Sequence, residues 1–488
     1  MITFLLSLIA LVFGYFFYGR FVEHVFGPDN RVTPAISKAD GLDFIVLPSW
    51  KVFMIQFLNI AGTGPIFGAI MGAKFGPIAY LWIVFGCIFA GAVHDYLSGM
   101  LSMRHGGAGQ PELVGHYLGK TTKSVMLVFA TLLLIMVGTV FVYSPAEILS
   151  SIGGEKMMWV VIIFIYYIIA TMLPIDKIIG RIYPIFAFSL LFMAAALLVV
   201  LLAKWPAIPE LWDHFYNMGL ATEPETWKDQ IFPCLFITIA CGAISGFHAT
   251  QTPLMARCLD SEQKGRPMFY GAMITEGVVA LIWASVASWF FYNEGEPGYA
   301  SLPAAVNGFH TSAAAVVNIV CNDWLGVMGA ILAMLGVVAA PITSGDTAFR
   351  SARLIVAEWL KLDQRPIAKR LYICVPLFLS SILMLLWQME NPDGFNVIWQ
   401  YFGWSNQTLS VFTLWTLTVY LVREGKCYWI TLIPALFMTT VCSTFLFVSK
   451  QAFGLSESVA YPLGGLCLLV AIVWFCLWYR KESCRLRA

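Results

Sequence analysis

Residues 59–65 read Asn59-Ile60-Ala61-Gly62-Thr63-Gly64-Pro65 and lie in the middle of an apolar run from 52 to 73. The run is long enough to cross a membrane as one helix. Glycine lowers the cost of leaving helical dihedral angles, and proline removes a backbone N–H donor. Backbone groups freed at membrane depth are costly unless they line a cavity or bind a ligand. The stretch therefore predicts an interrupted membrane helix.

A second stretch of this kind lies in the run from 230 to 256 and reads Cys241-Gly242-Ala243-Ile244-Ser245-Gly246-Phe247-His248. For either stretch alone, close packing of helices through small residues is an equally good explanation. As a pair, the stretches lie five spans apart in helices expected to run in opposite directions, as an inverted repeat requires. Interrupted helices at corresponding positions of inverted halves indicate the central site of a transporter.

Apolar runs recur along the whole chain, which is 59% hydrophobic and only 12% charged. Soluble proteins carry about 25% charged residues, so most of this chain is expected to lie in lipid. We predict an all-α polytopic membrane protein with about 13 transmembrane helices of roughly 20 residues each. The expected spans are 2–19, 52–73, 77–100, 124–143, 157–174, 182–203, 230–256, 267–292, 324–344, 371–388, 397–421, 427–448 and 460–479.

The predicted organisation has four parts. Residues 1–51 form an additional helix and a cytoplasmic loop, 52–203 the first inverted repeat, 230–421 the second repeat, and 427–488 additional helices with a basic tail. Lys and Arg concentrate in cytoplasmic loops. With the amino terminus outside and the carboxyl terminus in the cytoplasm, the 29 Lys and Arg residues fall inside except Lys74, Lys156, Lys204, Lys228 and Lys450.

The first interruption offers two kinds of ligand. The helix that restarts after Gly62, Thr63 and Gly64 presents backbone amides and a positive dipole end, which suit a substrate carboxylate. The carbonyl groups of residues 59–62 are suited instead to a cation.

His94 and Asp95 lie near one end of the third expected span. Ionisable residues within a span indicate function, often a proton relay, and histidine changes charge near physiological pH. Asp95 alternatively serves as a structural acid near Arg104.

His248 and Gln251 follow the second interruption and are expected to face the same cavity, unless His248 is a hydrogen-bonded core residue. Thr343, Ser344 and Asp346 place hard oxygen ligands, or a protonatable acid, at the expected end of the ninth span. The alternative is a helix stop in which Asp346 caps a helix over 347–360.

Asn406 and Gln407 lie side by side in the eleventh expected span, where they either join helices or line the pathway. The 11 cysteines show no CxxC pair and no Cys/His cluster with metal-ligand spacing. We therefore expect no cofactor and no metal beyond a possible sodium ion. No HExxH or GxSxG motif lies in the spans, so an enzyme is not expected.

Five segments resemble the carbon starvation protein A family, and the resemblance extends over nearly the whole chain. These are Asn59–Gly68, Gly91–Tyr96, Gly246–Arg257, Thr343–Asp346 and Gly403–Gln407. The resemblance implies a multi-pass protein of the bacterial inner membrane with a five-plus-five, leucine-transporter-like inverted repeat. It also implies peptide uptake during carbon starvation, or proton-coupled pyruvate uptake.

The resemblance assigns roles by position in that fold. A cation would lie between the first helix of repeat one and the third helix of repeat two, with Asn59, Ala61, Gly62, Thr343 and Ser344 as candidate ligands. Ser245, His248 and Asn406 would border the substrate.

Together these features predict a symporter that imports peptides or pyruvate by alternating access, driven by protons or sodium. A nutrient sensor on a transporter scaffold is the alternative. The expected partners are the small-molecule substrate, the coupling ion and the lipid bilayer, without nucleic acid. The oligomeric state is left open.

Overall fold

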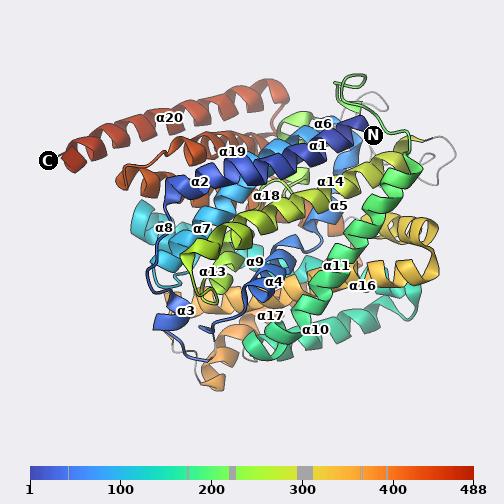
Figure 1. Cartoon of the computed structure of the whole chain (residues 1–488), viewed down its shortest axis with the longest axis horizontal. Coiled ribbons are helices and arrows are strands. Elements are labelled where there is room, and N and C mark those ends of the chain that lie inside the picture. The colour runs from blue at the N-terminus through green and yellow to red at the C-terminus, as the bar shows by residue number, and fades with distance from the viewer. Residues whose placement is uncertain are drawn as a thin grey trace.

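The computed structural model describes the chain apart from residues 42, 173–174, 219–226, 294–311, 363, 365, 392–393 and 488. Within the described part every regular element is a helix and no strand is present. Most helices run side by side along the long direction of the molecule (Figure 1). The predicted all-α membrane fold is thereby confirmed.

Helices of the first half cover the two predicted segments 1–51 and 52–203. They are α1 (Ile2–Phe13), α2 (Gly19–Phe26), α3 (Pro34–Ser37), α4 (Ser49–Ala61), α5 (Gly64–Gly72), α6 (Ile78–Leu81), α7 (Ala92–Arg104), α8 (Gln110–Leu118), α9 (Lys120–Ile152), α10 (Lys156–Met172) and α11 (Ile175–Lys204). Wider π-helical turns at Gly14–Tyr18 and Trp82–Gly91 join α1 to α2 and α6 to α7.

Helices of the second half begin after the loop that follows α11. They are a π-helical turn at Ile231–Leu235, α12 (Phe236–Thr238), α13 (His248–Ala256), a second π-helical turn at Arg266–Tyr270, α14 (Gly271–Tyr292), α16 (Ala313–Trp359), α17 (Ile367–Glu390), α18 (Gly394–Arg423), α19 (Trp429–Val448) and α20 (Glu457–Arg487).

Nine helices in the described residues are long and apolar enough to cross a membrane, and the bent pair α4 and α5 makes a tenth candidate. The other three expected spans have different shapes. They correspond to α10, which has 17 residues, to the broken segment from Ile231 to Ala256, and to the more polar α18. The count of thirteen and the inverted repeat remain predictions.

The first interruption lies where the sequence places it. Helix α4 ends at Ala61, α5 begins at Gly64, and the two helices are bent by 42°. Gly62 has φ +47° and ψ −145°, a conformation that residues with a Cβ rarely adopt. The chain therefore leaves the helix at the residue with the least steric restriction.

The second interruption is longer. Helix α12 ends at Thr238 and α13 begins at His248, so residues 239–247 are not helical. Both predicted discontinuous helices are thus present, because each interruption has a helical segment before it and another after it.

Helix α16 differs from the prediction. It was expected to end near 344, but it continues to Trp359, and a helical segment before the kink at Gly326 was not predicted. The hydroxyl of Thr343 donates to the carbonyls of Ala339 and Ala340, both at 2.9 Å. Hydroxyls that bond to carbonyls of the preceding turn are compatible with a continuous helix. The proposed N-cap role of Asp346 is therefore wrong.

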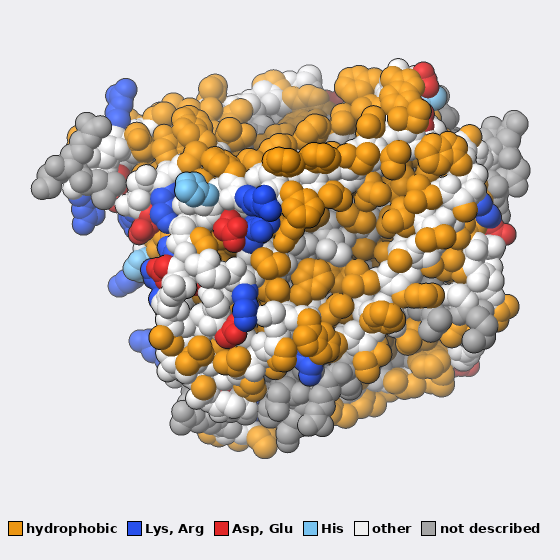
Figure 2. All heavy atoms as spheres, viewed as in Figure 1, with side chains coloured by type: hydrophobic (Ala, Val, Ile, Leu, Met, Phe, Trp, Pro, Cys, Tyr) orange, Lys and Arg blue, Asp and Glu red, His pale blue; other side chains and the backbone are white. Residues whose placement is uncertain are grey.

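The surface matches a protein that lies in lipid. Large apolar side chains cover most of the visible face, and charged side chains gather at the end where α2 and α8 lie (Figure 2). Phe17 is 68% exposed and Trp474 is 72% exposed, values that suit contact with hydrocarbon. Helix α20 lies along the outside of the bundle (Figure 1).

Candidate functional site

The two interruptions meet inside the bundle. A Cβ added to Gly64 would lie 2.3 Å from Sγ of Cys241, and one added to Gly242 would lie 3.7 Å from Cβ of Pro65. The first distance is too short for any side chain, so glycine at 64 is required for this contact. The backbone of each interrupted helix thus packs against the break in the other.

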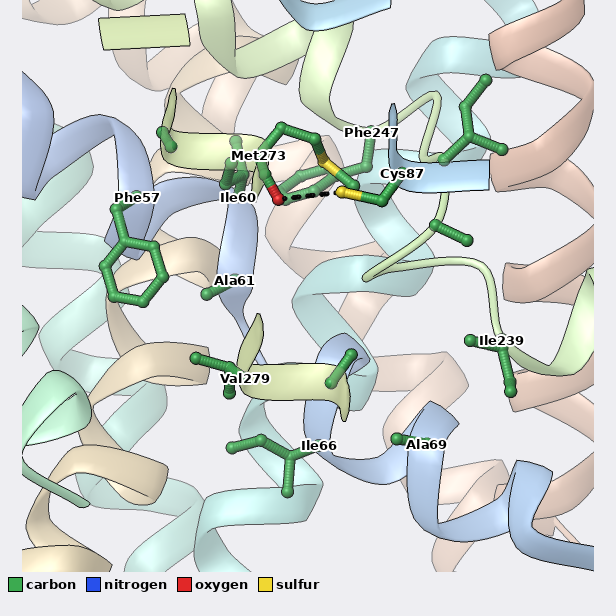
Figure 3. Packing of buried hydrophobic residues seen from close by; sticks show 14 of the residues in the cluster. Phe57, Ile60, Ala61, Ile66, Ala69, Cys87, Ile239, Phe247, Met273 and Val279 are labelled. Atoms are coloured by element: carbon green, nitrogen blue, oxygen red, sulfur yellow. Dashed lines mark hydrogen bonds between the residues drawn. The ribbon is translucent and has the colours of Figure 1, made fainter. Parts of the chain in front are cut away.

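Apolar residues hold the two interruptions together. Figure 3 shows them in one packed cluster with α14, and the labelled members include Ile60, Ala61, Ile66, Ile239, Phe247, Met273 and Val279. Sγ of Cys87 donates to the carbonyl of Met273 at 3.4 Å, as the dashed line marks. The site is therefore built on closely packed helices.

Helix α18 is bonded to the second interruption. Oδ1 of Asn406 accepts hydrogen bonds from Oγ of Ser245 at 3.0 Å and from the backbone N–H of Phe247 at 2.6 Å. Nε2 of Gln407 donates to the carbonyl of Phe236 at 2.8 Å. These bonds hold α18 against the segment around the second interruption, and the expected place of Asn406 beside the substrate remains a prediction.

Four ionisable side chains form a buried chain across three helices. Nδ1 of His94 and Nδ1 of His248 each lie 2.8 Å from a different oxygen of Asp95. Nε2 of His248 lies 3.5 Å from Oε2 of Glu276, whose Oε1 accepts from the N–H of Gly242 at 3.1 Å. All four side chains are fully buried. Asp95 is therefore not an interfacial acid beside Arg104, which instead bonds to Glu262.

Helix α16 reaches the end of α4 on another side of the site. Oγ of Ser344 donates to the carbonyls of Leu58 and Asn59, at 3.0 and 3.1 Å. A Cβ on Gly62 would lie 3.5 Å from the same hydroxyl. Ser344 is thus close to the carbonyls of the first interruption, whereas the hydroxyl of Thr343 bonds within its own helix.

Asp346 lies in a separate buried contact. Its Oδ2 accepts from the hydroxyl of Tyr183 at 2.5 Å, and that hydroxyl also bonds to the carbonyl of Thr343 at 3.1 Å. Asp346 therefore joins α16 to α11, and within the described residues it makes no hydrogen bond to the chain around Asp95.

Gln251 bonds to two residues that line a cavity beside α13. Its Nε2 donates to the hydroxyls of Thr250, at 2.8 Å, and Ser351, at 3.4 Å. The adjacent cavity has a volume of about 230 Å³ and lies between α8, α13 and α16. Gln110, Thr250, Arg257 and Ser351 are among the polar residues that line it. Gln251 is therefore placed beside this cavity through its bonds to Thr250 and Ser351.

Polar side chains without partners mark the first interruption. In the described part of the structure, the side-chain nitrogen and oxygen of Gln56 and Asn59 and the hydroxyl of Thr63 make no hydrogen bond. All three residues are fully buried. Buried polar groups are usually paired, so unpaired ones beside a break in a helix indicate a place for a ligand.

The structure therefore brings some predicted residues together and separates others. Residues around the contact of the two interruptions are Gly62, Thr63, Gly64, Ser245, His248 and Asn406, with Asn59, Ala61 and Ser344 beside them. His94 and Asp95 reach this group through His248. Asp346 and Gln251 lie in neighbouring contacts.

Three residues of the site were not predicted, namely Gln56, Cys241 as a side chain, and Glu276. Glu276 was the easiest to find, because it is an acid inside the expected span 267–292, and such acids indicate function. Donor atoms of Cys241, His248 and Glu276 all lie within 4.8 Å of one another, and theirs is the one group of this kind in the described residues.

The sequence matches the profile of the family described as carbon starvation protein CstA, over residues 1–152, 141–322 and 292–445. An uncharacterized membrane protein of Haemophilus influenzae is 45% identical over 60% of this chain and 92% of its own. The peptide transporter CstA of Campylobacter jejuni is 25% identical over 87% of this chain and 76% of its own. The pyruvate/proton symporter BtsT of Escherichia coli is 26% identical over 53% of this chain and 44% of its own.

Among solved structures, a manganese transporter of Eremococcus coleocola has a similar fold, with a TM-score of 0.55. It is 12% identical, and the match covers 92% of this chain and 99% of that one, so the likeness concerns the fold alone. The CstA and BtsT relatives and this neighbour are transporters and not enzymes. The chain is therefore a multi-pass membrane transporter that belongs to the carbon starvation protein CstA family.

Proposed function

We propose that this transporter imports small carboxylate-bearing nutrients, peptides or pyruvate, across the bacterial inner membrane by symport with protons or sodium. The observation that carries the proposal is the contact between the two interrupted helices, with Gly64 packed against Cys241. Interrupted helices that meet in the bundle form the substrate sites of several transporter folds. Two inverted repeats of five spans, at 52–203 and 230–421, are part of this proposal.

The substrate carboxylate would meet the start of α5. This helix begins at Gly64 without a side chain that caps it, so its positive dipole end remains for an anion. Pro65 has no N–H, and the N–H of Ile66 donates to the carbonyl of Thr63 at 3.2 Å, so the amide proposed to meet the carboxylate is that of Gly64. Asn59 and Thr63 supply buried polar groups without partners in the described structure. A carboxylate bound here would satisfy such groups and would need no cationic side chain.

The coupling ion has two proposed places. Sodium prefers several hard oxygen ligands, and Ser344 already lies beside the carbonyls at the end of α4. Asn59, Ala61 and Thr343 complete this proposed set. For a proton, the proposed acceptors are the buried acids Asp95 and Asp346, with His94 beside the former.

Release would occur through the polar cavity of about 230 Å³ beside Gln251 and Ser351. This cavity lies toward the end of the bundle that carries α8, where charged side chains gather (Figure 2). Because positive residues favour the cytoplasmic side, we assign this end to the cytoplasm and place the carboxyl terminus there. The symport reading and the use under carbon starvation find support in the names of the relatives.

Uptake into proteoliposomes tests the proposal. Labelled pyruvate and a labelled dipeptide are offered in turn, first with an imposed proton gradient and then with an imposed sodium gradient. Accumulation above equilibrium under one gradient is expected, and it identifies the substrate class and the ion. If both solutes bind but neither accumulates under either gradient, the nutrient-sensor alternative replaces the proposed function.

A further inference from the structure

Cys241, His248 and Glu276 point their donor atoms at one buried place. Sγ of Cys241, a ring nitrogen of His248 and a carboxylate oxygen of Glu276 all lie within 4.8 Å of one another. Cys241 is 3% exposed and the other two side chains are fully buried. A thiol, an imidazole and a carboxylate together form a mixed set of sulfur, nitrogen and oxygen donors.

Two of these donor atoms have no hydrogen-bond partner. Within the described structure, Nε2 of His248 and Oε2 of Glu276 make no hydrogen bond, although each belongs to a side chain whose other polar atom is bonded. Leaving a polar atom buried and unpaired is unfavourable, so each such atom requires an explanation. The two atoms face each other at 3.5 Å, within the distance of an ion pair for a protonated ring but longer than a good hydrogen bond, and a cation bound by both would give each a partner.

The surroundings of His248 resemble those of a metal-bound histidine. Its Nδ1 bonds to Oδ2 of Asp95 at 2.8 Å, so Nδ1 carries a proton, and in the neutral ring Nε2 then presents its lone pair. Histidines that bind metals usually make such a bond to a carboxylate, which fixes the tautomer and the ring orientation. The other oxygen of Asp95 is bonded to His94 at 2.8 Å, so Asp95 is held in turn.

Distances in the cluster suit a four-coordinate cation. Metal–ligand distances of about 2.0 to 2.3 Å place neighbouring ligands of a tetrahedral site roughly 3.4 to 3.8 Å apart. Nε2 of His248 and Oε2 of Glu276 are already 3.5 Å apart. Sγ of Cys241, within 4.8 Å of both, would approach by about 1 Å at most to complete the site.

We propose that Cys241, His248 and Glu276 form a binding site for a divalent transition cation of borderline softness, such as Zn²⁺. A thiolate and a carboxylate would balance the two positive charges, and His248 would bind as the neutral ring. Calcium and magnesium prefer sites made only of oxygen atoms, so the thiol disfavours them. Three protein ligands leave one tetrahedral position for water.

The site would link three parts of the chain. Cys241 lies near the start of the second interruption, His248 is the first residue of α13, and Glu276 belongs to α14. A bound cation would therefore hold both sides of this interruption against α14. Metal binding does not depend on the proposed substrate or coupling ion, so its test can fail while the transport proposal stands.

Binding of Zn²⁺ and Co²⁺ to the full-length protein in detergent tests the site. The exposed thiols of Cys427, Cys476 and Cys484 are first replaced by serine, because they bind metals without a built site. After a chelator has removed bound metals and Zn²⁺ has been added back, this parent protein is expected to bind one Zn²⁺ per chain. Its Co²⁺ complex is expected to show the thiolate-to-cobalt absorption band.

The matched variants are Cys241→Ser and Cys442→Ser. Cys442 is a buried thiol of α19, and its replacement is expected to leave the Zn²⁺ affinity and the Co²⁺ absorption band unchanged. Cys241→Ser is expected to abolish the absorption band and to weaken Zn²⁺ binding by more than about 100-fold. Loss of a residue that only orients a metal ligand weakens metal affinity by up to about 100-fold, and loss of the ligand itself should cost more. Glu276→Gln is expected to weaken binding while the band remains.

Two results would overturn the proposal. One is a parent protein that binds no added Zn²⁺ and shows no thiolate band with Co²⁺, a result that does not depend on any replacement within the cluster. The other is a Cys241→Ser protein that keeps the band and the affinity of the parent. Melting temperatures of all variants show whether a loss of binding follows from unfolding.

Discussion

Oδ2 of Asp95 and Nδ1 of His248 lie 2.8 Å apart, although 153 residues separate them in the sequence. The bond joins α7 to the first residue of α13, directly after the second interruption. Both side chains are fully buried. A carboxylate in such a place is stable only with partners, and Asp95 has one histidine on each oxygen.

Replacement of Asp95 by Asn is expected to destabilise the protein by about 3 to 5 kcal/mol, the usual cost of breaking a buried ionic pair. The amide of asparagine has one oxygen that can accept a hydrogen bond, so it can accept from only one of the two histidines. Its NH₂ group would then face the other histidine. The measurement is thermal unfolding in detergent, followed by a fluorescent thiol probe or by light scattering.

Asp323→Asn is the matched control. Asp323 is an exposed acid whose side chain is 58% accessible, and it pairs with Lys204 at 3.7 Å. Exposed pairs contribute about 0 to 1 kcal/mol, so this variant is expected to melt close to the parent. Equal melting temperatures for the Asp95 variant and the parent would contradict a stabilising role of the buried chain.

Gly64→Ala is expected to reduce transport. The new methyl group would lie 2.3 Å from Sγ of Cys241, so the two interruptions would have to separate. Overfilling a packed contact costs about 1 to 3 kcal/mol. If that cost falls on one conformation of the transport cycle, a barrier raised by about 1.4 kcal/mol slows uptake tenfold. Initial rates of uptake in proteoliposomes provide the measurement.

Gly465→Ala controls for the substitution itself. A Cβ at Gly465 in α20 meets nothing within 4 Å, so the parent rate is expected. A Gly64→Ala protein that transports at the parent rate would show that the contact between the interruptions can widen without consequence.

The interruptions were predictable because their signal is local. Gly62 and Pro65 change the backbone where they stand, and the need to satisfy backbone groups in lipid makes that change informative. Ser344 was also predicted beside the first interruption, through the resemblance to a family. Its bonds to the carbonyls of Leu58 and Asn59 place it there.

Other features depend on contacts that no local pattern contains. Glu276 stands alone in an apolar run, and its place beside His248 follows only from the packing of α14 against the second interruption. The error at Asp346 has a different cause. Hydroxyls followed by glycine and an acid look like the end of a helix, yet here the hydroxyl of Thr343 bonds to the preceding turn of a helix that continues.

Glu210 is expected to make stability depend on pH. Burial opposes its ionisation, but hydrogen bonds from the amino group of Met1, from Thr3 and from the N–H of Ile2 outweigh this effect and lower the pKa of Glu210 below its usual 4.5. A lowered pKa in the folded protein means that the contribution to stability is complete above 4.5. It is lost as the pH falls from 4.5 toward the lowered value.

Melting temperatures between neutral pH and acid test this contribution. Glu210→Gln is expected to melt below the parent at neutral pH, and the difference should shrink as the pH falls. The exposed Glu155, replaced by Gln, is the matched control and should follow the parent at every pH. A gap between the Glu210 variant and the parent that does not change with pH would mean that the carboxylate charge is unimportant.

Ser344→Ala tests whether sodium is the coupling ion. The hydroxyl of Ser344 lies 3.0 and 3.1 Å from the carbonyls of Leu58 and Asn59, where hard oxygen atoms of two helices meet. Loss of this oxygen is expected to abolish the stimulation of uptake by sodium and to leave the folded yield unchanged. Thr343→Ala is expected to act in the same direction.

Ser380→Ala is the control, because the exposed Ser380 donates only to the carbonyl of Pro376 in its own helix. If uptake by the parent responds to protons alone, or if Ser344→Ala keeps the sodium response, the hydroxyl serves only to hold α16 against α4.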